Sequence, residues 1–229
     1  VLHPRLTLVD GWTLAHLRQA LQKAPKPAHD LAPLSDADVM AKLGAADQSP
    51  EGEFMPDTYD YVLGMSDVGV LTRAHKAMQA FLAQEWTQRD KDIWPQQPYQ
   101  ALILASLVER ETAVPAERPE IAGVFERRLK LGMKLETDPS VIFGMGATYA
   151  GKIHKIDLQI DTPYNTYTRY GLPPTPIALP GRAAIHAVLH PAQGDALYFV
   201  AKGDGTHAFS ATLAEQNAAV KKYILGKKQ

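Results

Sequence analysis

Two glutamates, Glu109 and Glu111, stand where the apolar run "ALILASLV" (101–108) meets a charged stretch. Burial of a carboxyl group against apolar side chains favours its neutral form, and such a group can donate a proton near neutral pH. The ordinary alternative is a solvated last turn of a helix, in which Arg110 lies close to both acids. Spacing by itself favours this ordinary alternative.

Helical phase separates the two glutamates, because successive residues of an α-helix turn by about 100°. Glu111 continues the more apolar of two rows, the row formed by Leu104, Leu107 and Val108. Glu109 points roughly 200° away and continues a row of small or apolar residues. The two acids therefore cannot form a side-by-side carboxylate pair on one helix.

Two later stretches combine the residue types that bind sugars. They are "ETDPS" (136–140) and "YNTYTRYGLPP" (164–174), which together supply acids, an amide, hydroxyls and aromatic rings. Amides and carboxylates bind sugar hydroxyls, and an aromatic face packs against the apolar side of a pyranose ring. A turn with packed tyrosines has the same composition, so both interpretations stay open at this point.

A phosphate-binding loop is suggested and then rejected by the stretch "GMGATYAGKI" (144–153). Gly146, Gly151 and Lys152 have the required spacing, but Ile153 stands where such a loop needs Ser or Thr. That hydroxyl binds magnesium in nucleotide sites. The sequence therefore argues against nucleotide binding.

A histidine pair, His186 and His190, has the spacing that places two side chains on one helical face. No Glu follows His186, so the H-E-x-x-H pattern of zinc hydrolases fails, and His190 precedes a proline at the predicted helix end. We expect structural histidines, no metal and no cofactor.

Composition excludes several classes of protein. The 229 residues are 45% hydrophobic, enough for a sizeable core, and 24 basic residues nearly balance 25 acidic ones. A net charge of −1 creates no overall field that would attract nucleic acid or anionic lipid. The absence of cysteine excludes disulfides, cysteine-bound metals and thiol nucleophiles. No apolar run is long enough to span a membrane.

Apolar periodicity predicts helices over 11–24, 35–44, 66–89, 99–112, 119–132, 181–191 and 212–224. Ser35 is the predicted N-cap of the second, with Asp38 three residues on, and Thr212 and Glu215 form a capping box at the last. A short strand is predicted at 6–9 and a hairpin over 196–209.

The predicted fold class is α+β, with a soft boundary at the proline-rich stretch near residue 95. Residues 1–95 are expected to form a semi-independent mixed subdomain. Residues 96–229 are expected to form a helix-rich domain with a small β-hairpin and long structured loops. The loop-rich part, 133–182, is expected to be a functional surface.

Seven stretches, taken in order, resemble the YceG-like (MltG) family of endolytic murein transglycosylases. The residues that carry the likeness are "PEGEFMPDTY" (50–59), "LTRAHKAM" (71–78), "LASLVERETAVPAERPEIAGVFERRL" (104–129), "GMKLETDPSVIFGMG" (132–146), "YNTYTRYGLPPTPIALPG" (164–181), "HPA" (190–192) and "LYFVAKGDGTHAF" (197–209). The likeness covers nearly the whole chain.

This resemblance implies an enzyme with one essential glutamate that cuts peptidoglycan strands within their length. The role falls on Glu111, which is on the more apolar row and precedes Thr112, with Glu109 as the alternative or a supporting residue. The implied substrate-binding residues are Thr137, Asp138, Asn165, Thr166 and Tyr167.

The implied reaction is non-hydrolytic cleavage of the β-1,4 bond between N-acetylmuramic acid (MurNAc) and N-acetylglucosamine (GlcNAc). It leaves 1,6-anhydroMurNAc ends and would terminate the elongation of nascent strands. One rival interpretation is a muramidase-type hydrolase that uses Asp138 as a second acid. Another is a peptidoglycan-binding scaffold module without turnover.

The resemblance also implies partners and a location. The substrate is the peptidoglycan glycan strand, and cell-wall synthases of the elongation machinery are candidate partners. Family members carry an N-terminal membrane helix, often with a LysM-like segment, and neither is visible in this sequence. We expect a single-pass anchor in the bacterial inner membrane and a periplasmic catalytic domain.

Overall fold

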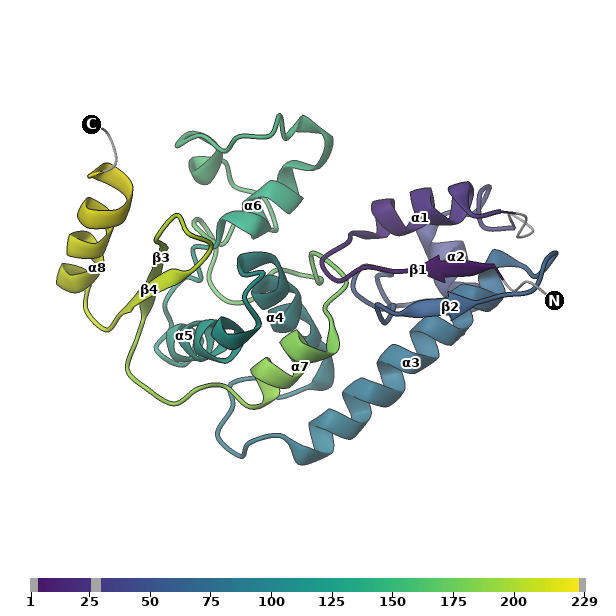
Figure 1. Ribbon diagram of the computed structural model, residues 1–229, viewed down its shortest axis with the longest axis horizontal. Coiled ribbons are helices and arrows are strands. Elements are labelled where there is room, and N and C mark those ends of the chain that lie inside the picture. The colour runs from purple at the N-terminus through teal and green to yellow at the C-terminus, as the bar shows by residue number, and fades with distance from the viewer. Residues whose placement is uncertain (1–3, 26–29, 227–229) are drawn as a thin grey trace.

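The computed structural model describes residues 4–25 and 30–226 (Figure 1). Within these ranges the chain forms eight α-helices and two separate two-stranded antiparallel sheets. The predicted α+β class is therefore confirmed. Of the helices in these ranges, none combines the length and the hydropathy that crossing a bilayer demands.

The N-terminal part is a small mixed layer on the right of Figure 1. Strand β1 (Arg5–Thr7) pairs antiparallel with β2 (Thr58–Asp60), and α1 (Leu14–Lys23) and α2 (Asp36–Lys42) pack beside them. As predicted, the Ser35 side chain caps α2 by accepting a hydrogen bond from the backbone of Asp38. A hydrophobic core of its own fills this part, with Leu17, Met40, Phe54, Leu71 and Leu179 among its buried members.

Helix α3 (Asp67–Gln88) joins this part to the rest of the protein (Figure 1). Its first turns place Val70 and Ala74 in the N-terminal core, and its later turns place Met78 and Leu82 in a second core. One helix thus belongs to two cores. The domain boundary near residue 95 stays a prediction.

The second core surrounds α4 (Pro98–Glu111), which is the central helix of the C-terminal part. Every residue from 101 to 108 is buried, because α3, α5 (Arg118–Lys130) and α7 (Arg182–Leu189) all pack against α4. Pro98 opens α4 at a position where its missing N–H costs nothing. The helix ends at Glu111, so the packing of the whole core determines where this carboxyl group lies.

Residues 133–182 are less loop-like than predicted. They contain α6 (Asp138–Met145), with Pro139 in its first turn. The sequence did not predict this helix, because its residues are mostly apolar and lack helical periodicity. Only Ser140 and Val141 of the helix are buried. Strand β2 was also missed, since the only strands predicted from the sequence lie at 6–9 and in the C-terminal hairpin.

The C-terminal segment contains the predicted hairpin, formed by β3 (Tyr198–Ala201) and β4 (His207–Ser210). Helix α8 (Leu213–Val220) follows, and the predicted capping box of Thr212 and Glu215 is present. Short 3-10 turns occur at Pro115–Glu117, Gly146–Thr148 and Asp157–Gln159, and a π turn at Lys221–Leu225.

Candidate active site

Glu111 lies at the end of α4 and faces the start of α6. Its Oε1 accepts a hydrogen bond from Oγ1 of Thr137, the buried N-cap residue of α6. Burial raises the pKa of Glu111 to about 7, against the opposing effect of the Thr137 hydrogen bond, and the negative charge of Asp138 adds to the rise. The carboxyl group can therefore both hold and release a proton near neutral pH.

Asp138 is the first residue of α6 and lies beside this carboxyl group. Its Oδ1 accepts a hydrogen bond of 2.6 Å from the phenol of Tyr167. Burial, and then this hydrogen bond, raise the pKa of Tyr167 well above its usual range. The phenol therefore stays protonated and holds Asp138 in place.

Asn165 and Thr166 are buried beneath these groups. The Thr166 hydroxyl accepts a hydrogen bond of 3.0 Å from the backbone N–H of Thr137. Asn165 donates to the Ile160 carbonyl at 2.7 Å and accepts from the backbone N–H of Tyr167 at 2.8 Å. The side chains of Asn165 and Thr166 therefore hold the backbone of Tyr167 and Thr137 in position. A direct contact of either side chain with a sugar stays a prediction.

Glu109 lies in a different environment from Glu111, as helical phase predicts. Its Oε1 accepts a hydrogen bond of 2.9 Å from Arg118, and its Oε2 accepts one of 2.9 Å from the backbone N–H of Gly181, the N-cap residue of α7. The Glu109 side chain is only 5% exposed. Both of its oxygens therefore tie the end of α4 to α5 and α7.

Glu136 precedes Thr137 in a left-handed backbone conformation, with φ of 54°. This conformation is uncommon for a residue with a side chain and stores a little strain beside the site. The Glu136 carboxylate forms an ion pair of 2.5 Å with Arg128. The ion pair between Glu136 and Arg128 and the left-handed turn at Glu136 fix the segment that places Thr137 against Glu111.

Sequence reasoning missed a network behind the end of α4. Thr112, the residue after Glu111, donates a hydrogen bond of 3.1 Å to Glu117, which also accepts from the backbone N–H of His207 at 2.7 Å. The His207 ring contacts the same carboxylate at 2.8 Å. The contacts between Glu117 and His207 join residues 90 positions apart, so no local sequence pattern predicts them.

A cavity of about 790 Å³ lies between α1 and α6. Its walls include Arg110 and Pro139, the chain neighbours of Glu111 and Asp138. Most of the remaining lining is apolar, with Leu14, Ile142, Phe143, Tyr149 and Ile177 among the lining residues. Glu111 and Asp138 themselves are not among the lining residues.

A family model decides which proteins this chain resembles. The model of the YceG-like family matches residues 2–222. The chain belongs to the YceG-like family. A YceG-like protein of known crystal structure from Listeria monocytogenes has the same fold, with a TM-score of 0.75 and 29% identity, over 95% of this chain and 76% of that one.

Two relatives with similar sequences are longer proteins than this chain. A Bacillus subtilis (strain 168) protein named endolytic murein transglycosylase is 46% identical over 131 residues, which cover 57% of this chain and 36% of the relative. A relative of the same name from Streptococcus pneumoniae serotype 2 is 31% identical over 191 residues, covering 81% of this chain and 32% of the relative. The chain thus spans about a third of their length.

Proposed function

We propose that this chain is the catalytic part of an endolytic murein transglycosylase, with Glu111 as its proton donor and acceptor. The observation that carries the proposal is the Glu111 carboxyl group, whose pKa is raised to about 7 by burial and whose Oε1 is held by Thr137. The names of the two relatives support the substrate class, peptidoglycan.

In the proposed reaction, protonated Glu111 donates its proton to the oxygen of the β-1,4 bond between MurNAc and GlcNAc. The bond breaks as an oxocarbenium-like state develops at C1 of the muramoyl unit. The Glu111 carboxylate then takes the proton of the C6 hydroxyl, whose oxygen attacks C1 and closes a 1,6-anhydro ring. Glu111 ends protonated, as it began, and a pKa near 7 suits both steps.

The surroundings of Glu111 suit this sequence of steps. Thr137 occupies Oε1, and within the described residues Oε2 makes no hydrogen bond, so Oε2 is the oxygen available to the substrate. A strand cut within its length needs room beyond the cleaved bond. We propose that the strand extends from Glu111 toward the cavity between α1 and α6, whose walls include Arg110 and Pro139.

The rival interpretation as a muramidase-type hydrolase assigns Asp138 the role of second acid. Asp138 already accepts the Tyr167 hydrogen bond at 2.6 Å, and in our proposal its charge stabilises the oxocarbenium-like state instead. The two reactions differ in their products, because hydrolysis leaves a reducing end that is heavier by one water.

The residue assignment is tested with Glu111→Gln and the matched variant Glu109→Gln. We expect Glu111→Gln to abolish cleavage of purified glycan strands, while the circular dichroism spectrum and strand binding persist. Glu109→Gln should keep measurable turnover for each folded molecule. Unchanged cleavage by Glu111→Gln would refute the assignment, and loss of turnover in folded Glu109→Gln alone would exchange the two glutamates. If wild-type protein binds strands without cutting them, the scaffold interpretation is correct.

For the full-length protein we further propose an N-terminal membrane anchor, a periplasmic catalytic domain and cell-wall synthases as partners. The proposal rests on the family resemblance, and a cell-wall substrate requires an extracytoplasmic active site. Termination of nascent strands is the role that endolytic cutting would serve. Fractionation of cells with an antibody to this chain tests the location, and recovery in the soluble cytoplasmic fraction would contradict it.

A further inference from the structure

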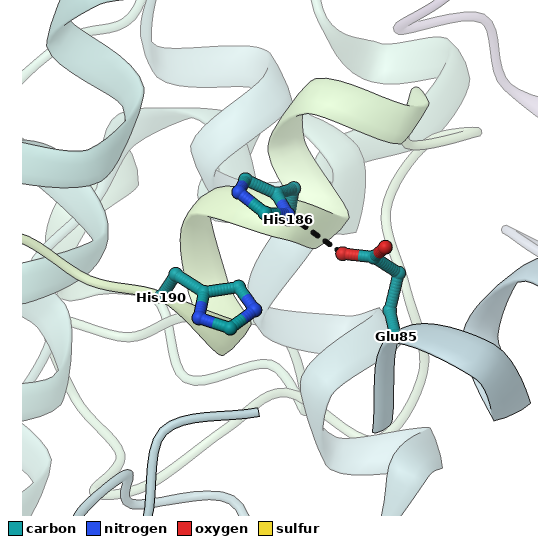
Figure 2. Close-up of side chains that lie close together, drawn as sticks. All are labelled: Glu85, His186 and His190. Atoms are coloured by element: carbon teal, nitrogen blue, oxygen red, sulfur yellow. Dashed lines mark hydrogen bonds and ion pairs between the residues drawn. The ribbon is translucent and has the colours of Figure 1, made fainter. Parts of the chain in front are cut away.

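Three potential metal ligands come together at the far end of α7. Glu85 from α3, His186 from α7 and His190, the C-cap residue of α7, each offer one ligand atom, and these atoms all lie within 4.8 Å of one another. Figure 2 shows the two rings and the carboxylate converging from the two elements. His186 Nδ1 lies 2.7 Å from Glu85 Oε2, and the two ring centroids are 4.5 Å apart.

Helical spacing and helix packing explain this convergence. Residues four apart lie on one face of a helix, so His186 and His190 project together from the end of α7. Helix α3 packs against α7 and brings Glu85, 101 positions earlier, to the same place. The sequence-based search for a zinc motif failed because it required a glutamate directly after His186.

A fourth residue holds one ring for ligation. Asp90 Oδ1 lies 2.9 Å from His190 Nδ1, and the backbone N–H of Asp90 bonds the Leu189 carbonyl at 3.0 Å. A carboxylate on Nδ1 retains the proton there and leaves the Nε2 lone pair free, which is the usual support of a metal-bound histidine. Figure 2 shows the His190 ring turned toward Glu85 and His186.

The charges also favour a divalent cation. The Glu85 side chain is only 12% exposed, yet no lysine or arginine within the described ranges forms an ion pair with it. The carboxylates of Glu85 and Asp90 both face this histidine pair, and zinc-like divalent ions bind such mixed sets of carboxylate and imidazole ligands.

We propose that Glu85, His186 and His190 bind a zinc-like divalent transition metal ion, with Asp90 orienting His190. Two histidines and a glutamate are an established three-ligand set for zinc, with water in the fourth position. Metal–ligand bonds of about 2.0–2.2 Å require ligand atoms roughly 3.3–3.6 Å apart in a tetrahedron. The His186 side chain is 62% exposed and can adjust. The ion would cross-link α3 to α7.

The test measures Zn²⁺ binding to protein without an affinity tag, by competition with a chromophoric chelator. We expect one ion for each chain, intense visible absorption of the Co²⁺ form typical of tetrahedral coordination, and a higher melting temperature with Zn²⁺. His186→Ala and His190→Ala should abolish all three signals. Asp90→Asn should weaken Zn²⁺ binding by about 10- to 100-fold.

His154→Ala is the matched control, because His154 is 61% exposed and forms a similar contact of 3.4 Å with Asp157. This variant should bind Zn²⁺ like the wild type. Equal binding by the wild type and the His186→Ala, His190→Ala double variant would overturn the proposal. So would an octahedral Co²⁺ spectrum of the wild type, a measurement that does not depend on any variant folding.

Discussion

Removal of the Thr137 hydroxyl tests how the protein adjusts the acidity of Glu111. Thr137→Val keeps the shape of the side chain and the 3.0 Å bond from its backbone N–H to Thr166, but removes the hydrogen bond to Glu111 Oε1. That bond lowers the pKa of Glu111 and opposes burial. We therefore expect the pKa to rise above its value of about 7.

The size of this rise follows from the strength of the lost bond. A hydrogen bond to a charged group contributes about 1.5–3 kcal/mol, and about 1.4 kcal/mol corresponds to one pH unit in a pKa. The pKa of Glu111 should therefore rise by about one to two pH units. The rate at pH 7 should also fall, since the carboxyl group is no longer held toward the bond that it protonates.

The assay is the pH dependence of kcat/KM for glycan-strand cleavage, which reports ionisation of the free enzyme. Because the first step needs protonated Glu111, wild-type activity should decline above a pH of about 7. In Thr137→Val the decline should begin about one to two pH units higher. Thr148→Val is the control, since the Thr148 hydroxyl bonds only the Met145 carbonyl of its own turn. A decline at the same or a lower pH in Thr137→Val would refute this account.

Three further predictions concern stability. Glu109→Gln breaks its buried ion pair with Arg118 and should lower the free energy of unfolding by about 3–5 kcal/mol in urea titrations at pH 7. Gly181→Ala places a Cβ only 2.4 Å from Asp10 Oδ1, and the melting temperature should fall by the equivalent of about 1–3 kcal/mol. Folding raises the pKa of Glu111 from 4.5 to about 7, so its contribution to stability is present below pH 4.5 and is lost as the pH rises through 7. Glu111→Gln should therefore stabilise the protein by up to about 3 kcal/mol at pH 8 and have little effect at pH 4, and an equal effect at both values would contradict the raised pKa.

Local signals in the sequence predicted local structure well. The capping residues Ser35 and Thr212 mark helix starts that the structure confirms, because a cap depends on residues within one turn. Helical phase also separated Glu109 from Glu111 correctly, since the two acids have different partners. Helix α6 was missed, because an apolar segment without periodicity resembles a buried loop as much as a helix.

The contacts that give the candidate site its chemistry are long-range and could not be predicted from the sequence. Thr137 meets Glu111 across 26 positions, and only the packing of α6 against α4 brings them together. The resemblance implies that Asn165 binds substrate, which stays a prediction, and its amide bonds to backbone groups that the sequence alone could not identify. Glu85 reaches His186 across 101 positions, so no motif search along the chain could join them.

Cleavage of purified glycan strands in water enriched in oxygen-18, with mass spectrometry of the new ends, tests the central claim most directly. In the proposed reaction the C6 hydroxyl of the substrate is the nucleophile, so the account predicts 1,6-anhydro ends that carry no oxygen-18. Reducing ends labelled with oxygen-18 would show that water attacks C1, and would contradict the account in favour of a hydrolase.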